Sequence, residues 1–255
     1  MRYLILSDIH GNREALDAVL KDARRKYDRA ISCGDLCDYG PDSNYVIDWA
    51  RANLMAVIRG NHDRVCAGLD TLDLFTELAQ TSARWTMEQL TPVNRNYLRE
   101  LPEGPKLVDN GLILVHGSPR DEDEYVTNMT EVNAIFAFLA VNAVSEVNAL
   151  PFFFGHTHLQ GAFVRAEGRT RGISAPLMPT PETRIGLDTG AAYLINPGSV
   201  GQPRDGDPRA AYAIFDSKSR EVALRRVPYD HLKTERKIVA AGLPLKLGIR
   251  LAFGR

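Results

Sequence analysis

The feature that most constrains the fold is a series of short apolar, β-prone runs that alternate with helical patterns. Each run has at most seven residues, which is the length of a buried strand rather than of a buried helix. The expected strands are Tyr3–Leu6, Ala30–Cys33, Leu54–Ile58, Leu112–Val115, Phe152–Phe154, Ala191–Ile195, Ala211–Phe215 and Glu221–Val227. Helical patterns lie between several of them, at Arg13–Arg25 behind an Asn12 cap and at Pro41–Ala52. Strands that alternate with helices predict a layered α/β architecture.

Composition narrows the class of protein but not its function. The chain has 255 residues, which suits one catalytic domain, and its 31 Lys and Arg nearly balance 32 Asp and Glu. There is therefore no overall basic field for nucleic-acid binding. The three cysteines, Cys33, Cys37 and Cys66, have no CxxC spacing, which argues against a secreted disulfide framework and favours a reducing cytoplasm. The apolar runs are too short for a signal peptide or a membrane span, so we expect a cytoplasmic protein.

Two stretches depart from the strand pattern. Residues 64–101 read as a helical insertion, with a helix start at Thr91-Pro92, and residues 165–189 are rich in Gly, Pro, Thr and Arg, which predicts an extended loop or hairpin. We therefore expect a catalytic domain at 1–227 that contains the insertion. Residues 228–255 would form a C-terminal helix and basic tail packed on the same domain.

Metal-binding and proton-carrying residues follow the apolar runs. In open α/β sheets functional groups gather at the carboxyl ends of strands. The residues at these points are Asp8 and His10, then Asp35, then Asn61, His62 and Asp63, then His116, and finally His156 and His158. Five of the six histidines lie in these loops, which leaves only His231 elsewhere. Such an ordered set favours a metal-dependent active site over scattered structural histidines.

The order of these motifs resembles the calcineurin-like metallophosphoesterases. That family carries DxH, GD, GNHD/E, a strand-end His and GHTH, and all five appear here in order. Residues 196–201, NPGSVG, are similar to a late loop of the small prokaryotic single-domain phosphodiesterases in that superfamily. The resemblance implies a four-layer α/β/β/α sandwich of two mixed β-sheets flanked by helices. Strand order alone does not distinguish this fold from a doubly wound sheet.

The resemblance also implies roles for the residues in the loops. The first metal would be held by Asp8, His10, Asp35 and His158, and the second by Asp35, Asn61, His116 and His156. His62 would be free for proton transfer. Imidazole, carboxylate and amide ligands suit manganese first, with iron, nickel, zinc or magnesium as alternatives.

These roles give a mechanistic hypothesis of attack on phosphorus by a metal-bridging hydroxide. His62, positioned by Asp63, would protonate the leaving oxygen. Arg204 follows the NPGSVG loop and is a candidate for binding a phosphate oxygen. Cys37 and Asp38 either shape the surroundings of the metals or fill space in a loop.

Several alternatives stay open. The leading function is a phosphodiesterase acting on a small or nucleotide-like diester, followed by a phosphomonoesterase on the same site and, more remotely, a non-catalytic scaffold. A basic pocket built from Arg165, Arg169, Arg171, Arg184 and Arg204 would favour the monoester. The insertion either covers the metals or only packs, and its Phe75 and Trp85 either belong to a core or stack on a base. The expected partner is a small phosphate-ester substrate, and residues 243–253 could support a homo-oligomer.

Overall fold

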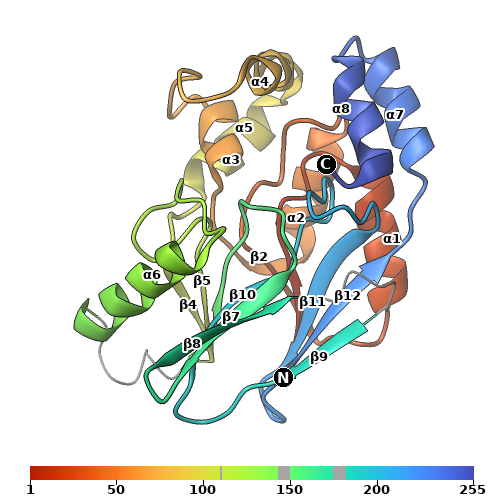
Figure 1. The fold of residues 1–255 in the computed structure, drawn as a ribbon. Coiled ribbons are helices and arrows are strands. Elements are labelled where there is room, and N and C mark those ends of the chain that lie inside the picture. Colours follow the sequence, from red (N-terminus) through yellow and green to blue (C-terminus); the bar gives the residue numbers. More distant parts are fainter. Residues whose placement is uncertain (110, 143–149, 175–181) are drawn as a thin grey trace.

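The computed structural model describes residues 1–109, 111–142, 150–174 and 182–255. Two mixed six-stranded sheets pack face to face between layers of helices (Figure 1). The first sheet has the order β3-β2-β1-β11-β12-β9, and the second β4-β5-β6-β10-β7-β8. The expected four-layer sandwich is therefore confirmed.

Both sheets combine early and late parts of the chain. The strands of the first sheet are β1 (Arg2–Leu6), β2 (Arg29–Ser32), β3 (Leu54–Val57), β9 (Glu182–Gly186), β11 (Ala210–Asp216) and β12 (Glu221–Val227). Those of the second are β4 (Lys106–Val108), β5 (Leu112–Leu114), β6 (Phe152–Phe153), β7 (Gly161–Ala166), β8 (Arg169–Ser174) and β10 (Ala192–Asn196). Strand β1 pairs in parallel with β2 but antiparallel with β11. The second sheet packs on the face of the first that helices would cover in a doubly wound fold, which rules out that alternative.

Clusters of buried apolar side chains hold the four layers together. Ile5 and Phe215 from the first sheet and Phe153 and Ile195 from the second belong to one apolar cluster between the sheets. On its other face the first sheet is covered by α1 (Arg13–Ala23) and α2 (Ser43–Asn53), and the second by α6 (Met129–Asn142). Helix α1 begins as expected, because the Asn12 side chain accepts a hydrogen bond from the amide of Ala15 at 3.2 Å.

The stretch at 165–189 contains strands that its composition, rich in Gly, Pro, Thr and Arg, does not indicate. Strands β7 and β8 form a hairpin, which agrees with one of the two expectations, whereas β9 leaves it to join the other sheet. Residues 175–181 lie outside the described part of the chain. Buried and half-buried residues alternate along β7, as expected of a strand, but the glycine and arginine residues in the neighbouring sequence obscure this pattern.

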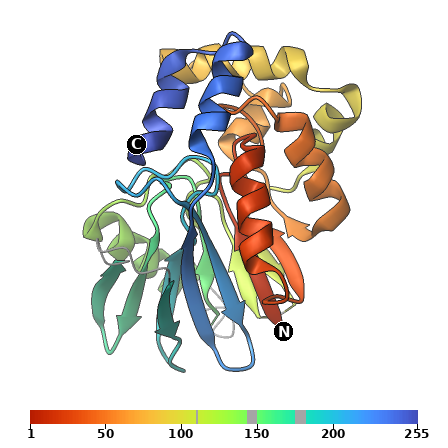
Figure 2. The same ribbon diagram turned by 90° about the vertical axis from the view of Figure 1, so that its right-hand side faces the viewer.

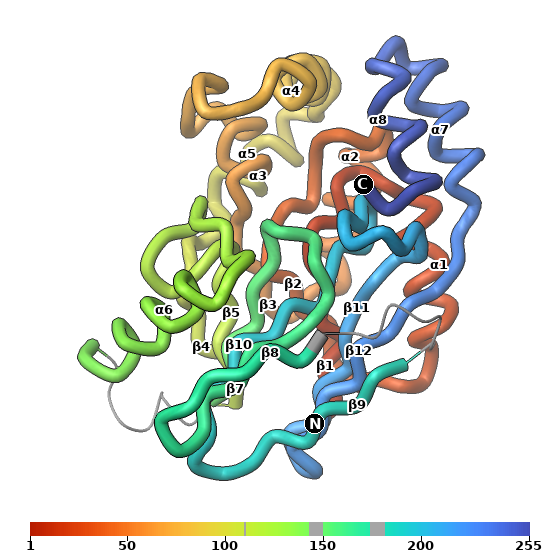
Figure 3. Tube along the Cα trace, viewed as in Figure 1, coloured from red at the N-terminus to blue at the C-terminus, as the bar shows by residue number. Residues whose placement is uncertain are grey.

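Helices from the middle and the end of the chain meet at one end of the molecule. These are α3 (Asn61–Cys66), α4 (Glu77–Gln89) and α5 (Pro92–Glu100), with α7 (His231–Ala240), α8 (Leu245–Ile249) and the 3₁₀ helix η2 (Arg250–Phe253). They gather at the top in Figure 1, and Figure 2 shows α7 and α8 beside the helices of the middle segment. The tube in Figure 3 shows the N-terminus at the opposite end.

One apolar cluster joins these two groups of helices. Leu247 and Leu251 are buried in it with Ala79 and Tyr39, and Trp85 packs against it. This contact supports a core role for Trp85. Leu245, Ile249 and Phe253 stay exposed, so self-association through residues 243–253 remains a prediction.

Replacing Leu247 by Ala should lower the free energy of unfolding by about 2–5 kcal/mol, because the side chain is fully buried and its loss leaves a cavity. The matched control is Leu245→Ala on the same helix, where the side chain is 51% exposed. Urea denaturation of the two variants measures the difference. Equal small losses would show that α8 is not packed against the middle segment.

Candidate metal centre

Loops from five strands converge into one cluster of ligands. Ligand atoms of Asp8, His10, Asp35 and His158 all lie within 4.8 Å of one another. A second group, Asp35, His116 and His156, meets the same limit. Asp35 belongs to both groups, so its carboxylate is placed between two ion positions. All of these residues are buried.

Individual distances agree with this grouping. His10 Nε2 lies 3.5 Å and His116 Nε2 3.4 Å from Asp35 Oδ2. His158 Nε2 lies 3.2 Å from Asp8 Oδ1. Asn61 Oδ1 is 3.2 Å from His116 Nε2, which places the amide oxygen in the second group. The structure thus brings together all seven residues that the sequence proposed as ligands.

Hydrogen bonds behind the imidazoles orient them towards the cluster. The Nδ1 atoms of His10, His116 and His158 lie 3.0, 2.8 and 2.5 Å from the backbone carbonyls of Cys37, Cys33 and Gln202. A carbonyl can only accept, so Nδ1 carries the proton and Nε2 presents a lone pair. His156 is turned the other way, with Nε2 3.1 Å from the carbonyl of Asp123. Such fixed tautomers are typical of metal-bound histidines.

The arrangement fits a divalent cation better than it fits a set of internal hydrogen bonds. His10 Nε2 and His158 Nε2 are 3.2 Å apart, so two lone pairs face each other. Asp8 Oδ2 and Asp35 Oδ2 are buried, and no group in the described part of the chain forms a hydrogen bond with them. Buried polar atoms are rarely left unpaired, and a cation would satisfy all four atoms at once. Nitrogen and oxygen ligands of this kind suit first-row divalent ions.

The pKa values of the second group show how strongly the carboxylates attract positive charge. Burial lowers the pKa of His116, but the charges of Asp35 and Asp8 outweigh it and raise that pKa to about 10. Burial and the neighbouring His116 lower the pKa of His156 to about 3. The carboxylates of Asp35 and Asp8 thus favour a positive charge at this position.

Backbone strain is concentrated at the cluster. Five of its residues adopt positive φ angles, namely Asp8, His10, Asp35, His156 and His158. This conformation is unfavourable for residues with a Cβ atom and is typical of functional sites. Gly60 is needed for a different reason: a Cβ there would lie 2.1 Å from Asp35 Oδ1.

The expectation that Asp63 positions His62 is wrong. The partner of His62 is Asp38, whose Oδ2 lies 2.6 Å from His62 Nδ1. The Asp63 carboxylate instead accepts hydrogen bonds from the amides of Gly60, Leu36 and Cys37. Asp63 is already occupied because it caps α3 and holds the loop that carries Asp35.

The sequence predicts for Asp38 only that it shapes the surroundings of the metals or fills space in a loop. Its position just after Asp35 is a signal that it lies near the centre, but the adjacency of Asp63 to His62 in the chain favours the other carboxylate. On helix α3 neighbouring side chains point in different directions, so sequence adjacency is a poor guide to contact.

A cavity of about 240 Å³ opens beside the cluster. It is lined by His62, Asn61 and His156 from the centre, and by Phe75 and Tyr125 from the surrounding segments. The Phe75 ring lies 4.5 Å from the His62 ring, and the Tyr125 ring 4.0 Å from that of His156. The segment at 64–101 thus contributes a wall of this cavity.

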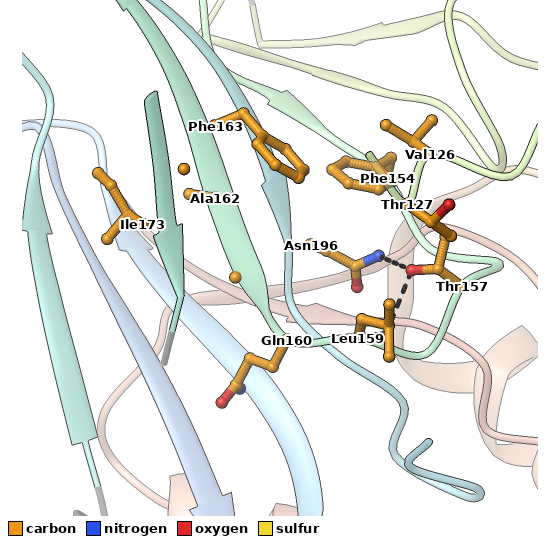
Figure 4. A pocket seen from close by; sticks show the side chains of 12 residues that line it. Val126, Thr127, Phe154, Thr157, Leu159, Gln160, Ala162, Phe163, Ile173 and Asn196 are labelled. Atoms are coloured by element: carbon orange, nitrogen blue, oxygen red, sulfur yellow. Dashed lines mark hydrogen bonds between the residues drawn. The ribbon is translucent and has the colours of Figure 1, made fainter. Parts of the chain in front are cut away.

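A second cavity, of about 260 Å³, contains none of the ligands (Figure 4). Phe154, Phe163 and Ile173 make most of it apolar. It reaches the loop between His156 and His158 at Thr157, whose Oγ1 accepts a hydrogen bond from Asn196 Nδ2 at 2.9 Å.

The arginines proposed for a basic pocket are dispersed. Arg165, Arg169 and Arg171 lie on the β7–β8 hairpin, and Arg184 pairs with Glu182 and Glu221. Of the five, Arg204 alone is placed beside the centre by a contact among the described residues, since its amide donates to the carbonyl of His158 at 3.3 Å.

Comparison with known proteins gives the family. Residues 1–220 match the model of the calcineurin-like phosphoesterase superfamily domain. This chain belongs to that superfamily. Its membership agrees with the Asp and His cluster and favours hydrolysis of a phosphoester. Among the described residues, no helix of this phosphoesterase has the length and apolar character needed to cross a membrane.

Individual relatives cover the whole chain. A metallophosphoesterase from Sphaerobacter thermophilus is 37% identical, with a TM-score of 0.82 over 100% of this chain and 99% of its own. An uncharacterized protein of Methanocaldococcus jannaschii is 35% identical over 98% of this chain and 97% of its own. A hypothetical protein from Pyrococcus horikoshii shares the fold at 21% identity, with a TM-score of 0.75 over 100% of this chain and 98% of its own.

Replacing Gly60 by Ala should weaken metal binding about 10- to 100-fold, because the added Cβ would push against the carboxylate of Asp35. Gly186→Ala is the matched control, since a Cβ there meets nothing within 4 Å. Metal content after equilibrium dialysis measures the effect. Full metal content in Gly60→Ala would contradict the close packing of Gly60 on Asp35.

Proposed function

We propose that this phosphoesterase uses two divalent metal ions to hydrolyse a phosphodiester with a small or nucleotide-like organic group. The observation that carries this proposal is that His62, paired with Asp38, lines the 240 Å³ cavity while its ring centroid lies 4.9 Å from that of His10 in the ligand cluster. Asp8, His10, Asp35 and His158 would hold one ion, and Asp35, Asn61, His116 and His156 the other. Manganese is our first expectation for both.

When bound, the two ions would activate water and offset negative charge on the phosphate. His62 would supply the proton that the leaving oxygen needs. Its Nδ1 is engaged by Asp38, which leaves Nε2 as the atom able to donate, and the Asp38 carboxylate would stabilise the imidazolium form. His62 itself is anchored because its backbone amide donates to Asp35 Oδ1 at 3.0 Å.

The cavity suits an organic leaving group rather than a second phosphate. Its walls include Phe75, Tyr125 and Leu74, which can contact a planar or apolar group. Its one arginine, Arg64, is already paired with Glu122, Asp123 and Asp70. A leaving group that enters here would therefore meet no unpaired arginine or lysine among the residues that line the cavity.

A phosphomonoesterase on the same metals is the second candidate. Arg204 favours it, because its guanidinium group lies over the Tyr39 ring beside the cluster and would stabilise the extra charge of a dianionic monoester. The scaffold alternative is weaker, since every residue needed for two ions and proton transfer is present. A cytoplasmic location stays part of the proposal and is compatible with three buried free cysteines.

Hydrolysis of bis-nitrophenyl phosphate and of mononitrophenyl phosphate, each with a panel of added divalent metals, tests the proposal. We expect metal-dependent turnover of both esters, with the larger kcat/KM for the diester and the highest rate with manganese. A larger kcat/KM for the monoester would favour the phosphatase. No turnover of either with any metal would support the scaffold.

Replacing His62 by Ala should lower kcat about 10²- to 10⁴-fold for a diester with an alkyl leaving group, and much less for nitrophenyl esters, because nitrophenolate leaves without a proton. Asp38→Asn should show the same dependence on the leaving group with a smaller loss. Metal content should stay unchanged in both variants. If the two kinds of ester lose rate equally, His62 is not the proton donor.

A further inference from the structure

Two arginines from distant parts of the chain converge on the Tyr39 ring beside the metal centre. The guanidinium carbon of Arg204 lies 5.9 Å and that of Arg250 4.6 Å from the ring centroid. The same ring lies 4.7 Å from the His10 ring and 4.6 Å from the His62 ring. Both guanidinium groups are thus separated by one aromatic side chain from a metal ligand and from the proton donor.

The C-terminal segment packs against the surroundings of Tyr39 through its own apolar side chains. Leu247 and Leu251, on either side of Arg250, are buried in the cluster that includes Tyr39. The carbonyl of Gly254 accepts a hydrogen bond from the amide of Gly206 at 3.0 Å, which ties the end of the chain to the loop that carries Arg204. The family model ends at residue 220, so it assigns no role to Arg250.

Neither arginine forms an ion pair with a carboxylate in the described part of the chain. The acidic residues nearest Arg204, Asp205 and Asp207, pair instead with Arg226 and Arg209. Arg204 Nη2 donates only to the neutral Gln202 side chain, at 3.1 Å.

The guanidinium group of Arg250 also has nitrogen atoms whose hydrogen-bonding capacity is not used. Its Nε and Nη2 atoms are buried and have no hydrogen-bond partner among the residues that the structure describes. Burial, followed by the like charge of Arg204, lowers the pKa of Arg250 to about 10, which still leaves it charged near neutral pH. Two adjacent positive charges with unpaired donors are stabilised by an anion.

We propose that Arg204 and Arg250 together bind a phosphate oxyanion of the substrate on the side of the metal centre formed by His10 and His158. Guanidinium groups match phosphate oxygens in geometry and charge, whereas the one guanidinium group that lines the cavity beside Phe75 and Tyr125, that of Arg64, is already paired with carboxylates. This site rests on the proposed function for its substrate. It makes the C-terminal segment part of the active site rather than a solvated tail, and Arg250 a substrate-binding residue.

Inorganic phosphate is the probe that tests the pair without any turnover. Its affinity for the metal-loaded full chain would be measured by calorimetry for the parent and for Arg204→Gln, Arg250→Gln and Arg250→Lys. We expect each Gln variant to bind phosphate at least about tenfold more weakly, with metal content unchanged. Arg250→Lys should lose less, because it keeps the charge. The matched control, Arg236→Gln, changes an exposed arginine of the same segment and should leave the affinity unchanged.

Several results would overturn the inference. Parent-like phosphate affinity in folded, metal-loaded Arg204→Gln and Arg250→Gln would do so, as would a parent that binds no phosphate. Loss of metal in parallel with phosphate would show that the arginines only support the metal loops. If Arg250→Gln fails to fold, Arg204→Gln decides, because its side chain lies in a loop and not in the C-terminal apolar cluster. A parent that hydrolyses no ester yet binds phosphate through both arginines would refute the proposed hydrolysis and leave the anion site standing.

Discussion

The Asp35 carboxylate is the point on which the structure of the site depends. It lies within 4.8 Å of the ligand atoms of both groups of histidines, and its Oδ1 also accepts a hydrogen bond from the backbone amide of His62. One side chain therefore fixes the relation between the two groups of candidate ligands and His62. Its own loop is held by Asp63, through the amides of Leu36 and Cys37, and is packed so closely that only glycine fits at position 60.

Holding Asp8 and Asp35 in this place is unfavourable for the protein taken alone. Both carboxylates are buried, each with one oxygen unpaired, and both residues adopt positive φ angles. Burying a charge without compensation costs several kcal/mol, and each strained residue adds about 1–3 kcal/mol. The apolar clusters between and outside the sheets offset this cost, and a bound cation would remove much of it. The strain is thus placed where a ligand can relieve it.

The surroundings of the centre are asymmetric in charge. Around the cavity the side chains are largely aromatic and Arg64 is paired with carboxylates. On the side of Tyr39, Arg204 and Arg250 form no ion pair with any described carboxylate. The helices of the middle segment and of the C-terminus join in one apolar cluster around Tyr39, so the two sides are built together. Under the proposed function, such an arrangement would orient a phosphate ester with its organic group in the cavity and its charge towards the arginines.

The sequence by itself determined the class of fold and the inventory of the metal centre. Short apolar runs require buried strands, and the polar motifs at their ends must meet where the strands end, so Asp8, Asp35 and His116 could be named without coordinates. Only the tertiary structure decided which carboxylate faces His62, because Asp38 and Asp63 are both near it in the chain and differ in the direction of their side chains. It also decided that Arg250 lies over the ring of Tyr39, next to the candidate metal ligands. That contact spans more than 200 residues from Tyr39, and no local pattern encodes it, since it arises from the packing of Leu247 and Leu251 against a distant helix.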